Sequence, residues 1–144
     1  MLKKISIVMP VLNEADNLRN FLNHLHLTEN EELIIVDGGS IDATVSIARE
    51  FTKNVFEAKT GRANVMNFGA GKARSDILLF LHADCMLPDN RFTLIRDALS
   101  NGNIAAGAFH LRIDHPCFGF RLIESVANFR SRMTSLIYGD QGMF

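Results

Sequence analysis

A histidine and an aspartate lie two residues apart directly after a long apolar run. The run is Ile77 to Leu81, and His82 and Asp84 follow it. Carboxylate oxygens suit hard divalent cations such as Mg²⁺ and Mn²⁺, and an imidazole nitrogen suits Mn²⁺ better than Mg²⁺. If residues 82–84 continue a strand, both side chains point to the same side of it. The pair therefore predicts a divalent-metal site that would neutralise a diphosphate leaving group.

Polar side chains also follow two earlier apolar runs. Asn13 and Glu14 come after the run at 5–11, and Asp37 comes after the run at 33–36. A single Asp in such a place is often only a turn or cap residue. Three strand ends that carry carboxylates or amides indicate one shared edge, because parallel α/β sheets bind ligands outside the carboxyl ends of their strands.

Strand-like and helix-like patterns alternate along the chain. Short apolar or β-branched runs predict strands over residues 5–11, 33–36, 54–58, 77–81 and 104–113. Helical spacing or composition predicts helices over residues 14–25, 40–51, 62–74, 88–99 and 118–137. Repeated strand–helix–strand units with buried strands predict an α/β fold with a mainly parallel sheet and helices on both faces.

Length and composition limit the class of protein. A chain of 144 residues suits one domain with a real core. The formal net charge of -1 gives no electrostatic case for a nucleic-acid partner. Two cysteines, Cys85 and Cys117, do not make a disulfide framework, so a reduced, cytoplasmic setting is expected. The apolar run after Lys4 is too short for a signal peptide or a membrane span.

Several well-known motifs are missing from the sequence. The dinucleotide fingerprint GxGxxG does not follow the first strand, where MPVLNEAD contains a proline and no glycine. Neither the phosphate-binding loop GxxxxGK[ST] nor the nucleophile motif GxSxG occurs. The strand-end carboxylates and His82 remain as the candidates for chemistry.

The predicted helix over 118–137 is amphipathic. Its apolar stripe consists of Leu122, Val126, Phe129, Met133, Leu136 and Ile137, and the arginines outside the stripe are Arg121, Arg130 and Arg132. Packing against the core or against a partner, a second copy of the chain included, is the favoured interpretation. A basic amphipathic helix can also lie on a membrane, so peripheral membrane contact stays open.

Four blocks of the chain resemble the N-terminal, nucleotide-binding part of glycosyltransferase family 2, which has the Rossmann-like GT-A fold. The blocks are SIVMPVLNEADNL at 6–18, IIVDGGSIDAT at 34–44, GRANVMNFGAGKA at 61–73 and LLFLHADCMLP at 78–88. No block is specific alone, but the ordered set is. HADC stands where the family usually has Asp-x-Asp. The chain is most similar to a bacterial branch with this histidine and with YGDQGMF, here at 138–144.

The resemblance implies a role for each strand-end loop in nucleotide binding. Pro10, Asn13 and Glu14 would form the loop beside the base and the ribose. Asp37 would accept a hydrogen bond from the base, and Ser40 lies in the adjoining turn.

The resemblance also implies a phosphate side of the site. Arg62 would lie near the phosphates at the start of a helix, whose N-terminal amides favour anions, and Asn67 lies further along the same helix. His82 and Asp84 would hold a divalent metal, Mn or Mg, and the diphosphate, with Asp84 the stronger candidate.

The implied reaction transfers a sugar from a nucleoside-diphosphate donor, most often a UDP-sugar, to an acceptor hydroxyl with inversion. A carboxylate base would take the proton of that hydroxyl. A nucleotidyltransferase is the rival enzyme, but the Gly-rich basic loop that it should carry after the first strand is absent. A nucleotide-binding module without turnover is the rival outside enzymes, and a donor-turnover assay separates the two.

The catalytic base is not evident in the sequence. The family usually places it in a Glu-Asp pair beyond the metal motif, and residues 89–144 contain no such pair. The base is therefore expected beyond Phe144, with Asp140 as a weak candidate within the chain. On this view residues 1–144 form one C-terminally incomplete domain. Residues 1–88 would be its nucleotide-sugar-binding half, and residues 89–144 would be the start of the acceptor half.

Overall fold

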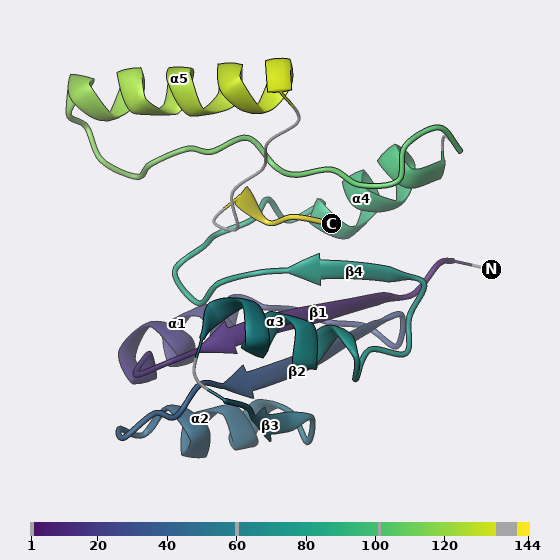
Figure 1. Ribbon diagram of the computed structural model, residues 1–144, viewed down its shortest axis with the longest axis vertical. Coiled ribbons are helices and arrows are strands. Elements are labelled where there is room, and N and C mark those ends of the chain that lie inside the picture. The colour runs from purple at the N-terminus through teal and green to yellow at the C-terminus, as the bar shows by residue number, and fades with distance from the viewer. Residues whose placement is uncertain (1, 60, 101, 135–140) are drawn as a thin grey trace.

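The computed structural model describes residues 2–59, 61–100, 102–134 and 141–144 (Figure 1). The strands are β1 (Ile5–Val11), β2 (Glu31–Asp37), β3 (Val55–Glu57) and β4 (Ile77–Phe80). The helices are α1 (Ala15–His24), α2 (Thr44–Phe51), α3 (Arg62–Ala70), α4 (Arg91–Ser100) and α5 (Phe118–Thr134). Asp140 lies outside the described residues, as do Leu136 and Ile137 of the predicted apolar stripe.

The four strands form one parallel sheet in the order β3-β2-β1-β4. The chain builds outward from β1 to β3 and then returns to the other side of β1 to add β4. Such a reversal of strand order leaves a crevice outside the carboxyl ends of β1 and β4, the adjacent strands between which the order reverses. The predicted mainly parallel α/β sheet is confirmed, and helices cover both of its faces (Figure 1).

The two faces of the sheet are buried against different helices. Alternate residues of β1, such as Ile7 and Met9, are fully buried against α1, α2 and α4. On the opposite face Val65 of α3 packs on Ile34 and Val36 of β2. Burial on both faces explains why these strands are continuous apolar runs and not alternating ones.

α3 approaches the sheet closely at Gly69. A Cβ atom on this residue would lie 2.4 Å from Val8 Cγ1 and 3.0 Å from Val36 Cγ2, closer than packed carbon atoms can come. Glycine therefore lets α3 pack directly on β1 and β2. Because α3 runs back across the sheet, its N-terminal residue, Arg62, lies at the carboxyl edge.

The strand predicted over 104–113 is wrong. Among the described residues of this segment only Ala108 forms a bridge, to Met143, and Met143 also bridges Phe80 of β4. Both bridges are antiparallel. The segment thus lies beside the sheet as an extended chain and contributes no regular strand.

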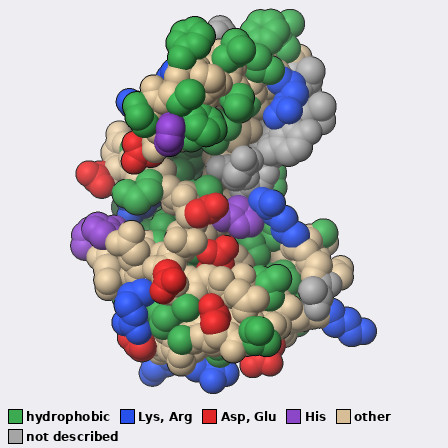
Figure 2. Space-filling model, turned by 90° about the vertical axis from the view of Figure 1, so that its left-hand side faces the viewer, with side chains coloured by type: hydrophobic (Ala, Val, Ile, Leu, Met, Phe, Trp, Pro, Cys, Tyr) green, Lys and Arg blue, Asp and Glu red, His purple; other side chains and the backbone are tan. Residues whose placement is uncertain are grey.

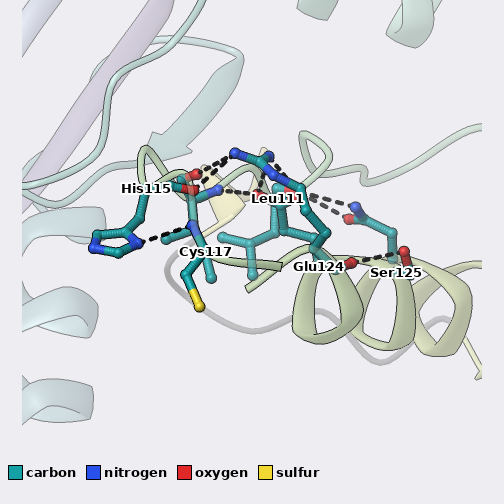
Figure 3. A network of polar contacts seen from close by, with 8 residues as sticks. Leu111, His115, Cys117, Glu124 and Ser125 are labelled. Carbon is teal, nitrogen blue, oxygen red and sulfur yellow. Dashed lines mark hydrogen bonds and ion pairs between the residues drawn. The ribbon is translucent and has the colours of Figure 1, made fainter. Parts of the chain in front are cut away.

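Side chains of α5 take the place of a strand partner further along this segment (Figure 3). The backbone N–H of Leu111 donates to Asn128 Oδ1 (2.8 Å), and Asn128 Nδ2 donates to the carbonyl of Leu111 (2.9 Å). The backbone N–H of Ile113 donates to Glu124 Oε1 (2.5 Å). Because these side chains satisfy the backbone groups, no hydrogen-bond ladder is needed there.

The apolar stripe of α5 faces solvent. The side chains of Leu122, Val126, Phe129 and Met133 are 59% to 68% exposed, and Figure 2 shows hydrophobic side chains gathered at the top, where Figure 1 places α5. The prediction that this stripe packs in the core of the chain is wrong, whereas contact with a partner or a membrane stays a prediction. No helix in the described part of the chain is long and apolar enough to cross a membrane.

Candidate functional site

A pocket of about 240 Å³ opens at the carboxyl edge of the sheet, where the strand order reverses. It is lined by Pro10, Val11, Leu12, Glu14, Gly38, Gly61, Arg62, Val65 and His82. These residues come from the ends of β1, β2 and β4 and from the start of α3. Figure 2 shows the molecule hollowed at its waist, with acidic, histidine and basic side chains gathered there. Four predicted site residues share the pocket: Pro10, Glu14, Arg62 and His82.

Arg62 and His82 are in direct contact inside this pocket. Nη2 of Arg62 lies 2.6 Å from Nε2 of His82. A guanidinium group can only donate hydrogen bonds, so Nε2 of the imidazole is the acceptor. The contact brings the start of α3 and the end of β4 together.

Asp37 holds the turn that follows β2. Its side chain is only 2% exposed. Oδ2 accepts hydrogen bonds from the backbone N–H groups of Gly39 (2.8 Å) and Ser40 (2.9 Å), and Oδ1 accepts one from the Ser40 hydroxyl. Gly39 has a φ of +106°, which glycine adopts at little cost. The carboxylate therefore has an architectural role, and its hydrogen bond to a base stays a prediction.

Asn13 and Ser40 join the loops that follow β1 and β2. The backbone N–H of Asn13 donates to Ser40 Oγ (2.8 Å), and the backbone N–H of Ile41 donates to Asn13 Oδ1 (2.9 Å). Asn13 has a φ of +53°, a left-handed conformation that asparagine tolerates better than most residues. Neither side chain lines the pocket, but together they fix the neighbouring residues Leu12 and Glu14 there.

Asp42 and Thr44 support the same loops and were not predicted as site residues. Asp42 Oδ1 accepts hydrogen bonds from the hydroxyl (2.5 Å) and the backbone N–H (2.9 Å) of Thr44, and Oδ2 accepts one from Ala15 N–H (3.2 Å). The hydrogen bond from the Thr44 hydroxyl, with those from the backbone, lowers the pKa of Asp42 below its ordinary value. Thr44 Oγ1 in turn accepts from the backbone N–H of Glu14 (2.8 Å). The signal in the sequence was an Asp two residues before a helix start.

His82 and Asp84 lie in different surroundings. β4 ends at Phe80, and the backbone N–H of Cys85 donates to the carbonyl of His82 (3.1 Å), which closes a turn over 82–85. The strand register that would put residues 82 and 84 on one side therefore ends before them. His82 lines the small pocket, whereas Asp84 is exposed and lines a second cavity.

The second cavity is the larger one, at about 810 Å³. It lies between the loop after β4, α4 and the extended segment 108–114, and Gln141 and Phe144 also line it. Asp84, His110, Arg112 and Asp114 supply its charged or imidazole side chains. Asp84, which lines this cavity, is only two residues along the chain from His82, which lines the small pocket.

No ready-made metal cage is present. In residues 2–59, 61–100, 102–134 and 141–144, no group of three or more His, Cys, Asp or Glu side chains is placed to hold an ion. Mg²⁺ is often bound by only one or two carboxylates and substrate phosphates, so Asp84 alone fits such a site. The metal roles of Asp84 and His82 stay predictions.

Some predicted and observed site residues differ. Asn67 is exposed on α3 and lines neither of the two cavities, and Asp140 lies outside the described residues. Leu12 and Val65 line the small pocket but were not predicted. Nothing in the sequence separates such apolar lining residues from residues of the core.

A parallel α/β sheet with a pocket at its carboxyl edge defines a broad class of nucleotide-binding folds. The sequence profile of the family described as Glycosyl transferase family 2 matches residues 6–139. Because this match covers nearly the whole chain, the chain belongs to glycosyltransferase family 2. The resemblance inferred from the four sequence blocks is confirmed.

A relative of known name supports the family assignment. The poly-beta-1,6-N-acetyl-D-glucosamine synthase of Staphylococcus epidermidis is 30% identical over 118 residues, which are 76% of this chain and 29% of the relative. The chain therefore spans less than a third of that protein.

Two solved structures share the fold. S. aureus TarS in complex with UDP-GlcNAc aligns with a TM-score of 0.68 and 17% identity, over 79% of this chain and 36% of TarS. The mannosyltransferase PcManGT from Pyrobaculum calidifontis in complex with GDP-Man and Mn²⁺ aligns with a TM-score of 0.71 and 19% identity, over 100% of this chain and 45% of that protein. At these identities the likeness concerns the fold, and the predicted GT-A fold is confirmed.

Proposed function

We propose that this chain forms the donor site of an enzyme that transfers a sugar from a nucleoside-diphosphate donor to an acceptor hydroxyl. The observation that carries the proposal is the pocket at the carboxyl ends of β1, β2 and β4, which joins Pro10 and Glu14 to Arg62 and His82. Membership of glycosyltransferase family 2 supports the reaction class. TarS with UDP-GlcNAc and PcManGT with GDP-Man support a nucleotide-sugar donor on this fold. A UDP-sugar is the first choice.

The base and the ribose are proposed to lie against the loops after β1 and β2. Pro10 and Leu12 offer apolar surface to the rings, and Glu14 offers a carboxylate to a ribose hydroxyl. Asp37 would accept from a base N–H, with Asn13 and Ser40 keeping its turn in place. The hydrogen bonds between the two loops support a preformed site, which reduces the entropy lost on binding.

The diphosphate is proposed to lie at the start of α3. Arg62 supplies a guanidinium, and the first backbone N–H groups of the helix point to the same edge. Gly61 has a φ of +120°, so the chain turns sharply before the helix and exposes these groups. Asn67 has the weakest support, because it does not line the pocket.

A divalent metal, Mn or Mg, is part of the proposal. The Mn²⁺ in the PcManGT complex supports it for this fold. Asp84 would hold the ion together with donor phosphates, whereas His82 fits less well because its Nε2 accepts a hydrogen bond from Arg62. When bound, the ion would stabilise negative charge on the departing diphosphate.

Inversion by direct displacement requires a general base for the acceptor hydroxyl. Asp140 stays a weak candidate for this base. The larger cavity beside Asp84 is the proposed approach for the acceptor, because Asp84 in its lining is only two residues from His82 in the lining of the donor pocket. Residues 1–88 would then bind the donor, and residues 89–144 would begin the acceptor side. The cytoplasm is the expected compartment, with peripheral membrane contact through α5 as the alternative.

Calorimetric titration with UDP, GDP and dTDP, each with and without Mn²⁺, tests the proposal. We expect one nucleoside diphosphate to bind, and to bind more tightly with Mn²⁺. Absence of binding by all three under both conditions would contradict a donor site. Release of the nucleoside diphosphate from the matching sugar donor would then distinguish an enzyme from a binding module.

A further inference from the structure

The Arg62–His82 contact fixes the roles of both imidazole nitrogens. Nη2 of Arg62 lies 2.6 Å from Nε2 of His82. Guanidinium nitrogens carry only donors, so Nε2 must accept and cannot carry a proton. A neutral imidazole has one acceptor nitrogen and one N–H, so its proton lies on Nδ1.

This arrangement does not suit a metal ligand. A histidine that binds a metal gives a ring lone pair to the ion and donates its other N–H to a neighbouring acceptor. In His82 the lone pair of Nε2 is used by Arg62, and Nδ1 has none to offer. A metal on His82 would require the guanidinium to leave.

Arg62 also differs from the arginines that are paired with carboxylates. Among the described residues, close ion pairs with glutamates are Arg19–Glu50, Arg96–Glu31 and Arg121–Glu124, and Arg49 lies further from Glu57, at 3.9 Å. Arg62 instead bonds to a neutral ring, which orients the guanidinium without cancelling its charge. The remaining N–H groups of its planar fork match two oxygens of a phosphate.

We propose that His82 is a positioning residue that holds Arg62 for the donor diphosphate and is not a ligand of the metal. Arg62 then supplies fixed positive charge on one side of the diphosphate, and Asp84 is the protein carboxylate for the ion on the other. The inference rests on the proposed donor site. It reduces the predicted protein ligands of the metal from two, His82 and Asp84, to Asp84 alone.

The pairing can be measured in the free chain, without nucleotide. Long-range ¹H–¹⁵N spectra at about pH 8, where an ordinary imidazole is neutral, report which ring nitrogen carries the proton. The spectrum of His82→Gln assigns the His82 signals. We expect the Nδ1–H form in the wild type and a shifted tautomer ratio in Arg62→Ala. An Nε2–H form in the wild type would overturn the pairing.

Nucleotide titrations measure the consequence. Loss of a hydrogen bond from a charged donor should weaken UDP binding by Arg62→Ala about ten- to hundredfold, and His82→Ala should weaken it less, because Arg62 remains. His82→Gln should restore binding to within about twofold of the wild type, since the amide oxygen can accept from Arg62. Adding His82→Ala to Arg62→Ala should change little, because one residue acts through the other.

Mn²⁺ binding in the presence of UDP, followed by electron paramagnetic resonance, separates positioning from ligation. We expect Asp84→Ala to lose Mn²⁺ affinity and His82→Ala to keep it. Equal losses in these two variants, or additive losses in the Arg62/His82 double variant, would overturn the proposal. Failure of UDP to bind the wild type would contradict the UDP site itself, while the tautomer measurement would still decide the pairing.

Discussion

The two parts of the chain are held together in different ways. Across residues 5–80, backbone hydrogen bonds run from strand to strand and apolar side chains are buried on both faces of the sheet. Across residues 104–134, Asn128 and Glu124 of α5 bind the backbone of an extended segment, and the apolar stripe of the helix is exposed. One part is a packed sheet, and the other is a helix attached by polar side chains.

This difference indicates which part can carry a precise site. Loops at the carboxyl edge of a hydrogen-bonded sheet inherit the positions of its strands, and the hydrogen bonds among Asn13, Asp37 and Ser40 fix them further. A helix held by side chains can shift when one contact is lost. We therefore expect variants of the first part to change nucleotide binding or global stability, and variants of α5 to change local attachment or association.

The largest effect is expected at Asp84, where a substitution should change nucleotide binding without changing the stability of the fold. Asp84→Ala should abolish the Mn²⁺-dependent part of nucleoside-diphosphate binding and leave the melting temperature unchanged, because this carboxylate is exposed. Asp97→Ala, which removes an exposed carboxylate of α4, is the control and should bind like the wild type. Calorimetry with and without Mn²⁺ measures both variants. Unchanged Mn²⁺-dependent binding in Asp84→Ala would remove the metal assignment.

Asp37→Asn tests whether the carboxylate at the end of β2 accepts a hydrogen bond from the nucleotide base. A hydrogen bond to a charged group contributes about 1.5–3 kcal/mol, so a ten- to hundredfold weaker affinity for the nucleoside is expected, with or without metal. The turn should also loosen, because a neutral amide oxygen accepts from the backbone N–H groups of Gly39 and Ser40 less strongly than a carboxylate oxygen does. Titration with the nucleoside and with its diphosphate checks this. A loss confined to the diphosphate would place Asp37 in the metal site instead.

The same substitution in two helices contrasts the two parts directly. Gly69→Ala in α3 should destabilise the fold by about 1–3 kcal/mol, because the new Cβ would lie 2.4 Å from Val8 Cγ1. Gly119→Ala in α5 should be neutral or stabilising by up to about 1 kcal/mol, since the nearest atom there is Cys117 Sγ at 3.9 Å. Urea unfolding measures both changes. A similar loss in the two variants would contradict the difference in packing.

Glu124 should govern the attachment of α5. The hydrogen bond from the backbone N–H of Ile113, together with the Arg121 guanidinium, lowers the pKa of Glu124 below its ordinary value. A carboxyl group whose pKa is lower in the folded state than in the unfolded state stabilises the folded state. This contribution is complete at a pH above the pKa of the unfolded state, and it is lost as the pH falls through the pKa of the folded state. Protection of the Ile113 amide from hydrogen exchange should therefore fall below about pH 4.5.

Glu124→Gln should remove this pH dependence, and protection of the Ile113 amide should fall about tenfold at neutral pH. The amides of β1 serve as the internal control and should keep their protection. If the amides of β1 lost protection equally, α5 would belong to the same cooperative unit as the sheet.

A small effect on stability is expected on the exposed stripe of α5. Phe129→Ser should change the free energy of unfolding by less than about 0.5 kcal/mol, because the ring is 66% exposed. It should nevertheless reduce self-association or binding to anionic vesicles, whichever the wild type shows in sedimentation. Exposed Thr93→Ser on α4 is the control. A large loss of stability would mean that the stripe is packed after all.

Local patterns predicted the packed part well. β1 was predicted with its observed bounds, Ile5–Val11, because burial on both faces leaves an unbroken apolar run. Helix ends were predicted less accurately: α3 ends at Ala70 and not at residue 74, and α4 begins at Arg91 and not at residue 88. The alternation over 104–113 predicted a strand, because alternation does not reveal that Glu124 and Asn128 supply the backbone partners.

The site was predictable by residue type more than by geometry. Strand-end positions identified Asp37 and His82, since the order of elements alone brings the carboxyl ends together, and the family resemblance identified Arg62. The hydrogen bond between Arg62 and His82 depends on how closely α3 packs on the sheet at Gly69, and no local pattern contains that distance. The turn that separates His82 from Asp84 was not foreseen either, because the apolar run does not show that β4 ends at Phe80.

The most direct test of the donor site is an amide chemical-shift map of the chain titrated with UDP, GDP and dTDP in the presence of Mg²⁺. Binding at the proposed pocket should shift the amides of Glu14, Gly38 and Arg62, and should leave the amides of 108–114 and α5 near their free positions. Shifts gathered along 108–114, or none for any of the three nucleotides, would contradict a donor site at the carboxyl ends of β1, β2 and β4.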